Sequence, residues 1–112
     1  MAADHIVTIT VDSVTGEFTY SPTDVRAQKN ETIEFQCGNL NSKFEVMFKH
    51  RTPGDRTHIS DRTPKDEGPA GKKGHLQCTG DYGQYTYGAA IYDGNNVFID
   101  AGCGHIGVGN NN

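Results

Sequence analysis

Short runs in which apolar and polar residues alternate constrain this chain most, because they recur from residue 6 almost to the C-terminus. Residues 6–11 place Val7, Ile9 and Val11 on one face, and residues 32–37 do the same with Ile33, Phe35 and Cys37. A period of two is typical of strands with one buried face. The 14 glycines interrupt the sequence too often for long helices.

Further strands are expected where the alternation resumes after turn residues. These runs are residues 17–21, 44–48, 75–79, 83–91, 97–99 and 106–108. Asp93-Gly94 is a strong hairpin-turn signal, and the parity of the 83–91 run sends Tyr85 and Tyr87 into the core. About seven or eight short strands predict an all-β fold, an antiparallel Greek-key β-sandwich or barrel, and periodicity alone does not choose between the two.

The chain length favours one domain. A chain of 112 residues suits a single core, which we place at residues 6–108, with a disordered tail at 109–112. Between residues 49 and 75 the alternation stops and Pro and Gly recur, which predicts a long irregular excursion. Such loops are uncommon in compact domains and are usually functional or mobile.

Charge and cysteine content limit which binding partners and which cellular compartment are expected. A net charge of −4 without a basic tail argues against nucleic-acid binding. No apolar stretch reaches the roughly 18 residues of a membrane span, and the N-terminus lacks signal-peptide features, so we expect a cytoplasmic protein without a membrane partner. Cys37, Cys78 and Cys103 are odd in number, so reduced thiols are the default expectation.

Several phrases of the sequence resemble the cupredoxin family, the plastocyanin and azurin type of β-sandwich, across residues 6–108. They are Phe-Thr-Tyr-Ser-Pro at 18–22, Phe-Glu-Val-Met-Phe at 44–48 and Gly-Gln-Tyr-Thr-Tyr at 83–87. The resemblance implies a Greek-key sandwich and, in typical members, a copper site built from two His, a Cys thiolate and often a Met.

The residues that the resemblance assigns to copper are replaced here. Phe44 stands at the first His position, and Gly88 or Ala89 stands where the Cys is expected. Residues 100–108 echo the family's ending, with Cys103 in place of Met. The resemblance therefore implies a degenerate member without the copper ligands, and we expect no cofactor.

An alternative is a rebuilt copper or zinc site, because thiolate and imidazole suit both metals. It would combine Cys103 and His105 with a distant histidine such as His50, His58 or His75. The competing interpretation is a loop thiol beside a surface histidine.

Two further groups are candidates for ligand or partner binding. Within or beside the excursion, His58 and three arginines, Arg51, Arg56 and Arg62, could present an anion-binding face, unless neighbouring Asp and Glu residues neutralise it. Tyr82 and Tyr92 fall outside the core parity and are candidates for surface contacts.

No hydrolase signature or phosphate-binding loop is present, so an enzyme is not expected. The leading hypothesis is a non-enzymatic binding or self-association module whose partner is an unknown protein or small ligand. The alternatives are a metal-binding or electron-transfer protein centred on Cys103 and His105, and a homo-oligomeric structural or storage protein, since open sandwiches expose edge strands.

Overall fold

The computed structural model describes residues 3–38, 43–60, 73–93 and 95–109, and these fold without a helix. Nine strands are present among them. They are β1 (His5–Val11), β2 (Phe18–Ser21), β3 (Asp24–Gln28), β4 (Thr32–Cys37), β5 (Lys43–Phe48), β6 (His58–Ser60), β7 (Lys73–Gln77), β8 (Gly83–Asp93) and β9 (Asn96–Gly109). The prediction of an all-β fold is confirmed. The predicted strand number was too low, because β3 and β6 were not anticipated, although two of the expected runs, 97–99 and 106–108, belong to the single strand β9.

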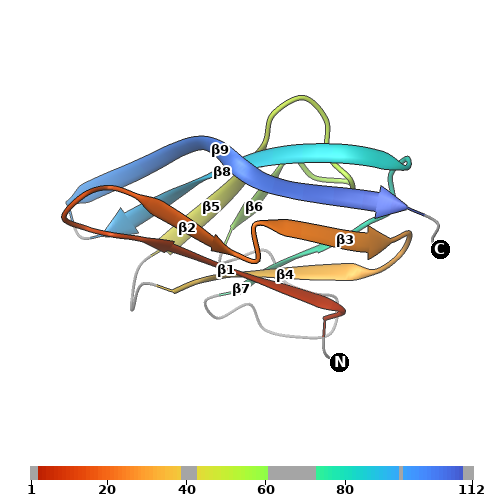
Figure 1. The fold of residues 1–112 in the computed structure, drawn as a ribbon, viewed down its shortest axis with the longest axis horizontal. Helices are drawn as coiled ribbons and strands as arrows, with labels where there is room; N and C mark the ends of the chain where they lie inside the picture. The colour runs from red at the N-terminus through yellow and green to blue at the C-terminus, as the bar shows by residue number, and fades with distance from the viewer. Residues whose placement is uncertain (1–2, 39–42, 61–72, 94, 110–112) are drawn as a thin grey trace.

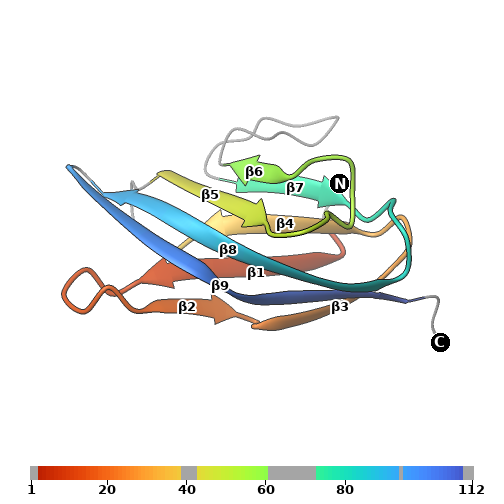
Figure 2. The same ribbon diagram turned by 90° about the horizontal axis from the view of Figure 1, so that it is seen from above.

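Two sheets form the layers of a sandwich (Figure 1). One has four strands in the order β2-β1-β4-β7, and the other has five in the order β3-β9-β8-β5-β6. Figure 2 shows that the long β8–β9 hairpin runs most of the length of the molecule.

The sheets are mixed, which corrects the expectation of a purely antiparallel sandwich. β1 pairs in parallel with β4, and β3 pairs in parallel with β9. The chain leaves the four-stranded sheet after β2, forms β3 in the other sheet and returns as β4. Because β4 does not reach β1 through a tight hairpin, the two strands can run in the same direction.

An aromatic cluster around Tyr87 occupies the core. The Tyr87 ring is fully buried and makes edge-to-face contacts with Tyr20, Phe35 and Phe48, with ring centroids 5.5 to 5.7 Å apart. Such pairs add stability beyond the apolar area they bury. Tyr85 is also buried, so both tyrosines point inward as their parity predicted.

The excursion expected at 49–75 is partly regular, which corrects its predicted boundaries. It contains β6, and β7 begins at Lys73; residues 61–72 lie outside the described part of the chain. A Cβ built on Gly74 would lie 2.2 Å from the backbone oxygen of Ser60. The two sheets therefore meet closely along β6 and β7.

Cys37 and Cys78 lie at opposite ends of β4. Cys37 is opposite Ile9, whereas the N–H of Cys78 donates to the carbonyl of Glu31. The length of β4 separates them by about 20 Å, which excludes a disulfide between them. Burial raises the pKa of the Cys78 thiol to about 11. Cys103 lies in β9, but its side chain is outside the described structure.

The ends of the chain add two observations. Gly109 was expected in the disordered tail but is the last residue of β9, and residues 110–112 lie outside the described part. Within the described ranges, no helix is present that has the length and apolar character needed to cross a membrane.

Candidate interaction surface on the β8–β9 hairpin

The outer part of the β8–β9 hairpin, residues 89–93 and 95–100, is named the arm here. In it Tyr92 pairs with Val97 and Ala90 with Ile99. Gly94 of the predicted Asp93-Gly94 turn lies outside the described residues, but the strands pair up to Asp93 and Asn96. The arm projects at the left of Figures 1 and 2.

A bulge joins the arm to the rest of the hairpin. β9 advances four residues, from Asp100 to Gly104, while β8 advances only two, from Tyr87 to Ala89. Because the extra length is an even number of residues, the alternation of faces along β9 is the same on both sides of the bulge.

Three apolar side chains on the arm face away from the core, and we name them the apolar strip. Tyr92, Val97 and Ile99 are 41%, 53% and 70% exposed. Ile91 and Phe98, which are next to the strip residues in the sequence, pack against the core. Because side chains alternate along a strand, the strip lies on the outer face. The structure thus exposes large apolar side chains side by side on paired strands.

Charged residues of β5 border the strip. Lys43 lies opposite Tyr92, and Glu45 lies opposite Ala90. Two cross-strand rows result, one reading Lys43-Tyr92-Val97 and the other Glu45-Ala90-Ile99. An apolar centre with a charged margin is the pattern of a protein interface.

The arm also has an open edge. Among the described residues, β9 pairs over Asn96–Ile99 with β8 alone, whereas over His105–Val108 it pairs with both β8 and β3. The open edge ends near β2, where the Tyr20 hydroxyl donates to Asp100 Oδ2 at 2.8 Å. An unpaired strand edge is a template for another strand.

Of the two predicted surface tyrosines, only Tyr92 belongs to the strip. Tyr82 is 51% exposed, as expected, but its ring lies under the Lys29 ammonium, 4.8 Å from the centroid. Lys29 belongs to the turn between β3 and β4, at the other end of the molecule from the arm (Figure 1). The structure therefore does not bring the two tyrosines together.

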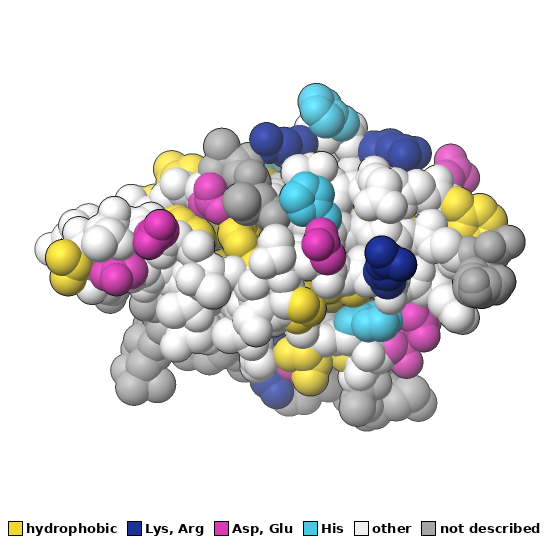
Figure 3. Space-filling view, in the orientation of Figure 1, with side chains coloured by type: hydrophobic (Ala, Val, Ile, Leu, Met, Phe, Trp, Pro, Cys, Tyr) yellow, Lys and Arg dark blue, Asp and Glu magenta, His cyan; other side chains and the backbone are white. Residues whose placement is uncertain are grey.

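The predicted anion-binding residues are dispersed. The Arg51 guanidinium lies 4.6 Å from the centre of the Tyr85 ring. Arg56 contacts Asp55 at 3.8 Å, and His58 is an exposed residue of β6. Arg62 lies outside the described residues. Figure 3 shows one face of the molecule, where charges of both signs and histidines are interspersed and do not form a single basic patch.

The histidines of the predicted metal site lie apart. His75 faces outward from the four-stranded sheet, with Nε2 3.2 Å from Glu34 Oε1. His105 faces outward from the five-stranded sheet, with Nδ1 3.4 Å from Asp24 Oδ1. His50 is exposed just after β5. No group of three His, Cys, Asp or Glu in the described ranges is placed to hold a metal ion.

The positions that the cupredoxin resemblance assigns to copper do not fit the metal. Phe44 is 2% exposed and Ala89 is fully buried, and both side chains face the core. Neither side chain has an atom that binds copper. The Cys103 side chain, which completes the alternative site, lies outside the described structure.

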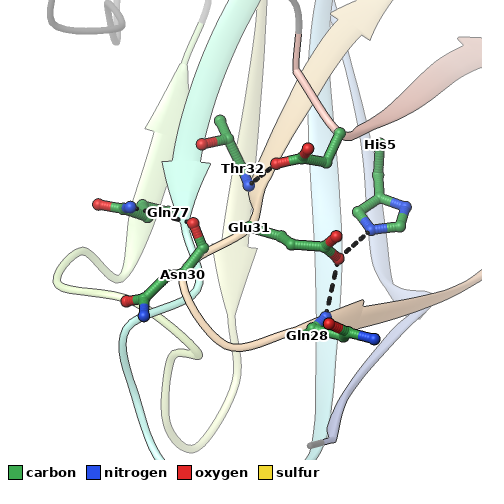
Figure 4. A network of polar contacts seen from close by, with 7 residues as sticks. His5, Gln28, Asn30, Glu31, Thr32 and Gln77 are labelled. Carbon is green, nitrogen blue, oxygen red and sulfur yellow. Dashed lines mark hydrogen bonds and ion pairs between the residues drawn. The ribbon is translucent and has the colours of Figure 1, made fainter. Parts of the chain in front are cut away.

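A polar network holds the end of the molecule opposite the arm. The Glu31 carboxylate accepts from the N–H of Gln28 at 2.9 Å and lies 2.8 Å from His5 Nε2 (Figure 4). The Gln28 hydrogen bond, and then His5, hold the pKa of Glu31 below its usual range. In the same network Gln77 donates to the carbonyl of Asn30. These contacts tie the β3–β4 turn to β1 and β7, a structural role.

Sequence reasoning treated Val97 and Ile99 as ordinary strand residues and missed their exposure. The signal was present in the run Val97-Phe98-Ile99, because three successive apolar residues in a strand must place apolar side chains on both faces. Phe98 packs against the core, so its two neighbours remain outside.

Comparisons with known proteins found two structural likenesses and no match in sequence. No protein-family model matches the chain, and no curated protein matches it. Two solved cupredoxins are similar in structure. A Sinorhizobium pseudoazurin has a TM-score of 0.43 and 16% sequence identity, and the match covers 94% of this chain and 74% of the pseudoazurin. Auracyanin B has a TM-score of 0.42 and 14% identity, and the match covers 97% of this chain and 91% of auracyanin B. The sandwich assignment itself depends on the strand order and burial described above.

Proposed function

We propose that this chain acts by binding a protein partner through the apolar strip of the arm, and not by catalysis. The single observation that carries the proposal is the exposure of Tyr92, Val97 and Ile99 together on paired strands. Isolated exposed apolar residues are normal, but adjacent ones bounded by charged residues mark interaction sites.

The open edge of β9 supports the same surface. Sandwich proteins usually protect an edge by charged side chains, proline or a covering loop. Over Asn96–Ile99 the side chains are amide or apolar, and the only strand that pairs with this segment in the described structure is β8. A partner strand added here would gain main-chain hydrogen bonds as well as contact with the strip.

The test is site-specific photo-crosslinking in the full chain. A benzoylphenylalanine in place of Ile99 is expected to crosslink a protein, either a second copy or another chain, in cells that produce this protein. The matched control replaces Val14, which is 91% exposed in the β1–β2 turn and carries no neighbouring strip.

Crosslinks at position 99 that are absent at position 14 support the proposal. Equal labelling at both positions, or no protein adduct at position 99, contradicts it. Because both positions are exposed, neither replacement is expected to alter the fold, and circular dichroism checks this.

A further inference from the structure

We infer that the partner of the arm is a second copy of this chain, joined by antiparallel pairing of two β9 strands about a two-fold axis at Phe98. The inference rests on the proposed function, since it names the occupant of the same surface. Its support is the self-complementary order of the residues Asn96-Val97-Phe98-Ile99-Asp100, of which Asn96–Ile99 form the open edge.

A two-fold axis at Phe98 places apolar residues of one copy opposite apolar residues of the other. It places Val97 of one copy opposite Ile99 of the other, twice, because a two-fold interface repeats each contact. Directly opposite residues of antiparallel strands point to the same side, so these pairs lie on the outer face, where both side chains are already exposed. Asn96 is opposite Asp100, so no like charges oppose each other.

Neighbouring registers are less favourable. An axis at Val97 places Asn96 opposite Phe98, and an axis at Ile99 places Asp100 opposite Phe98, so each pairs a polar residue with an aromatic one. An axis between residues would place Val97 opposite Phe98, although these two side chains point to different faces of β9. Only the axis at Phe98 pairs every apolar residue with an apolar one.

The two cross-strand rows also continue from one copy of the chain into the other. The row Lys43-Tyr92-Val97 of one copy continues as Ile99-Ala90-Glu45 of the other. Four adjoining positions without charge then occupy the centre, with one lysine and one glutamate at the margins. This reproduces the apolar core and polar rim of a protein interface.

The charged residues that border the strip balance each other. The chain carries a net charge of −4, which disfavours contact between copies in general. At the strip, however, the bordering residues Lys43 and Glu45 have opposite signs. The pairing must still overcome the negative charge of the chain, to which Asp93 and Asp100 of the arm contribute.

Sedimentation equilibrium of the full chain at low salt tests the inference, with two double variants. Val97→Lys/Ile99→Glu places opposite charges across the predicted pair, whereas Val97→Lys/Ile99→Lys places like charges there. We expect a wild-type dimer, a weaker dimer of the Lys/Glu variant, and an association constant of the Lys/Lys variant lower than that of the Lys/Glu variant by about tenfold or more.

A wild-type chain that stays monomeric at about 1 mM overturns the inference, and crosslinking of another protein at position 99 would then leave the proposed function standing. A dimer that neither double variant weakens overturns the inference, because the arm is not its interface, and the crosslink at position 99 then decides the proposed function by itself. Equal weakening by the two variants overturns the register at Phe98.

Discussion

The two halves of β9 belong to one strand and keep the same alternation, yet they differ in what surrounds them. His105–Val108 lies between β8 and β3, and its apolar residues Ile106 and Val108 face the core. Asn96–Ile99 pairs with β8 alone in the described structure, and Val97 and Ile99 face outward. An apolar residue in a strand thus contributes to the core or stays exposed according to its face and its neighbours.

The bulge at Gly88 separates these two halves. It lengthens β9 by an even number of residues, so the core face continues into the arm, where Phe98 packs against the core. The arm is therefore anchored on its inner face while its outer face and edge stay open. The predictions below test this contrast in order of decreasing effect.

Truncation of one isoleucine in each half gives the largest difference. Ile106 is fully buried, so Ile106→Ala is expected to lower the free energy of unfolding by about 4 kcal/mol through lost contacts and a cavity. Ile99 is 70% exposed, so Ile99→Ala should change the stability of the monomer by about 0.5 kcal/mol or less. Urea unfolding at low protein concentration measures both, and equal losses would contradict the contrast.

Two glycines of β9 give the next largest difference. A Cβ on Gly104 would lie 2.1 Å from Cζ of the buried Tyr87, so Gly104→Ala must displace a core ring and is expected to cost about 3 kcal/mol. A Cβ on Gly107 would first meet the flexible Gln84 amide at 3.0 Å, and Gly107→Ala should cost less than about 1 kcal/mol. The reverse order in urea unfolding would show that Tyr87 is not packed as described.

The smallest effect is expected at Glu31, whose carboxylate accepts a hydrogen bond from Gln28 at the end of β3. β3 in turn pairs with the second half of β9. The folded-state pKa of Glu31 is lowered, chiefly by the Gln28 hydrogen bond. Its stabilisation is therefore complete above the pKa of the unfolded chain and is lost as the pH falls through the folded-state pKa.

Glu31→Gln should reduce the loss of unfolding free energy at acid pH by less than about 1 kcal/mol, because the pair of Glu31 and His5 is partly exposed. Unfolding free energies measured from pH 6 to pH 3 provide the check. An unchanged acid slope in the variant would contradict a role of the Glu31 carboxylate.

The strands of the core were predictable because alternation reports which side chains are buried together. Phe35, Tyr85 and Tyr87 point inward as the pattern indicated, and Tyr82 and Tyr92 are exposed as predicted. The strand β3 was missed because Val25 and Ala27 are its only buried residues, too few for a clear period. The parallel pairing of β1 with β4 was also missed, since alternation carries no information about strand direction.

The candidate surface was less predictable than the core. Tyr92 was identified by parity, but exposure of Val97 and Ile99 depends on which strands cover the outer face, a tertiary property. The predicted histidines and arginines could not be grouped from sequence spacing, because the sandwich places His75 and His105 on the outer faces of different sheets. Their proximity in the chain to irregular segments did not indicate proximity in space.

Hydrogen–deuterium exchange of β9 at increasing protein concentration tests the central claim most directly. Amides of His105–Val108 should be protected at every concentration, because this part of β9 already pairs on both sides. Amides of Asn96–Ile99 that point to the open edge should exchange quickly in dilute protein and become protected as the concentration rises. Exchange in Asn96–Ile99 that is independent of concentration, and that no partner slows, would contradict the account.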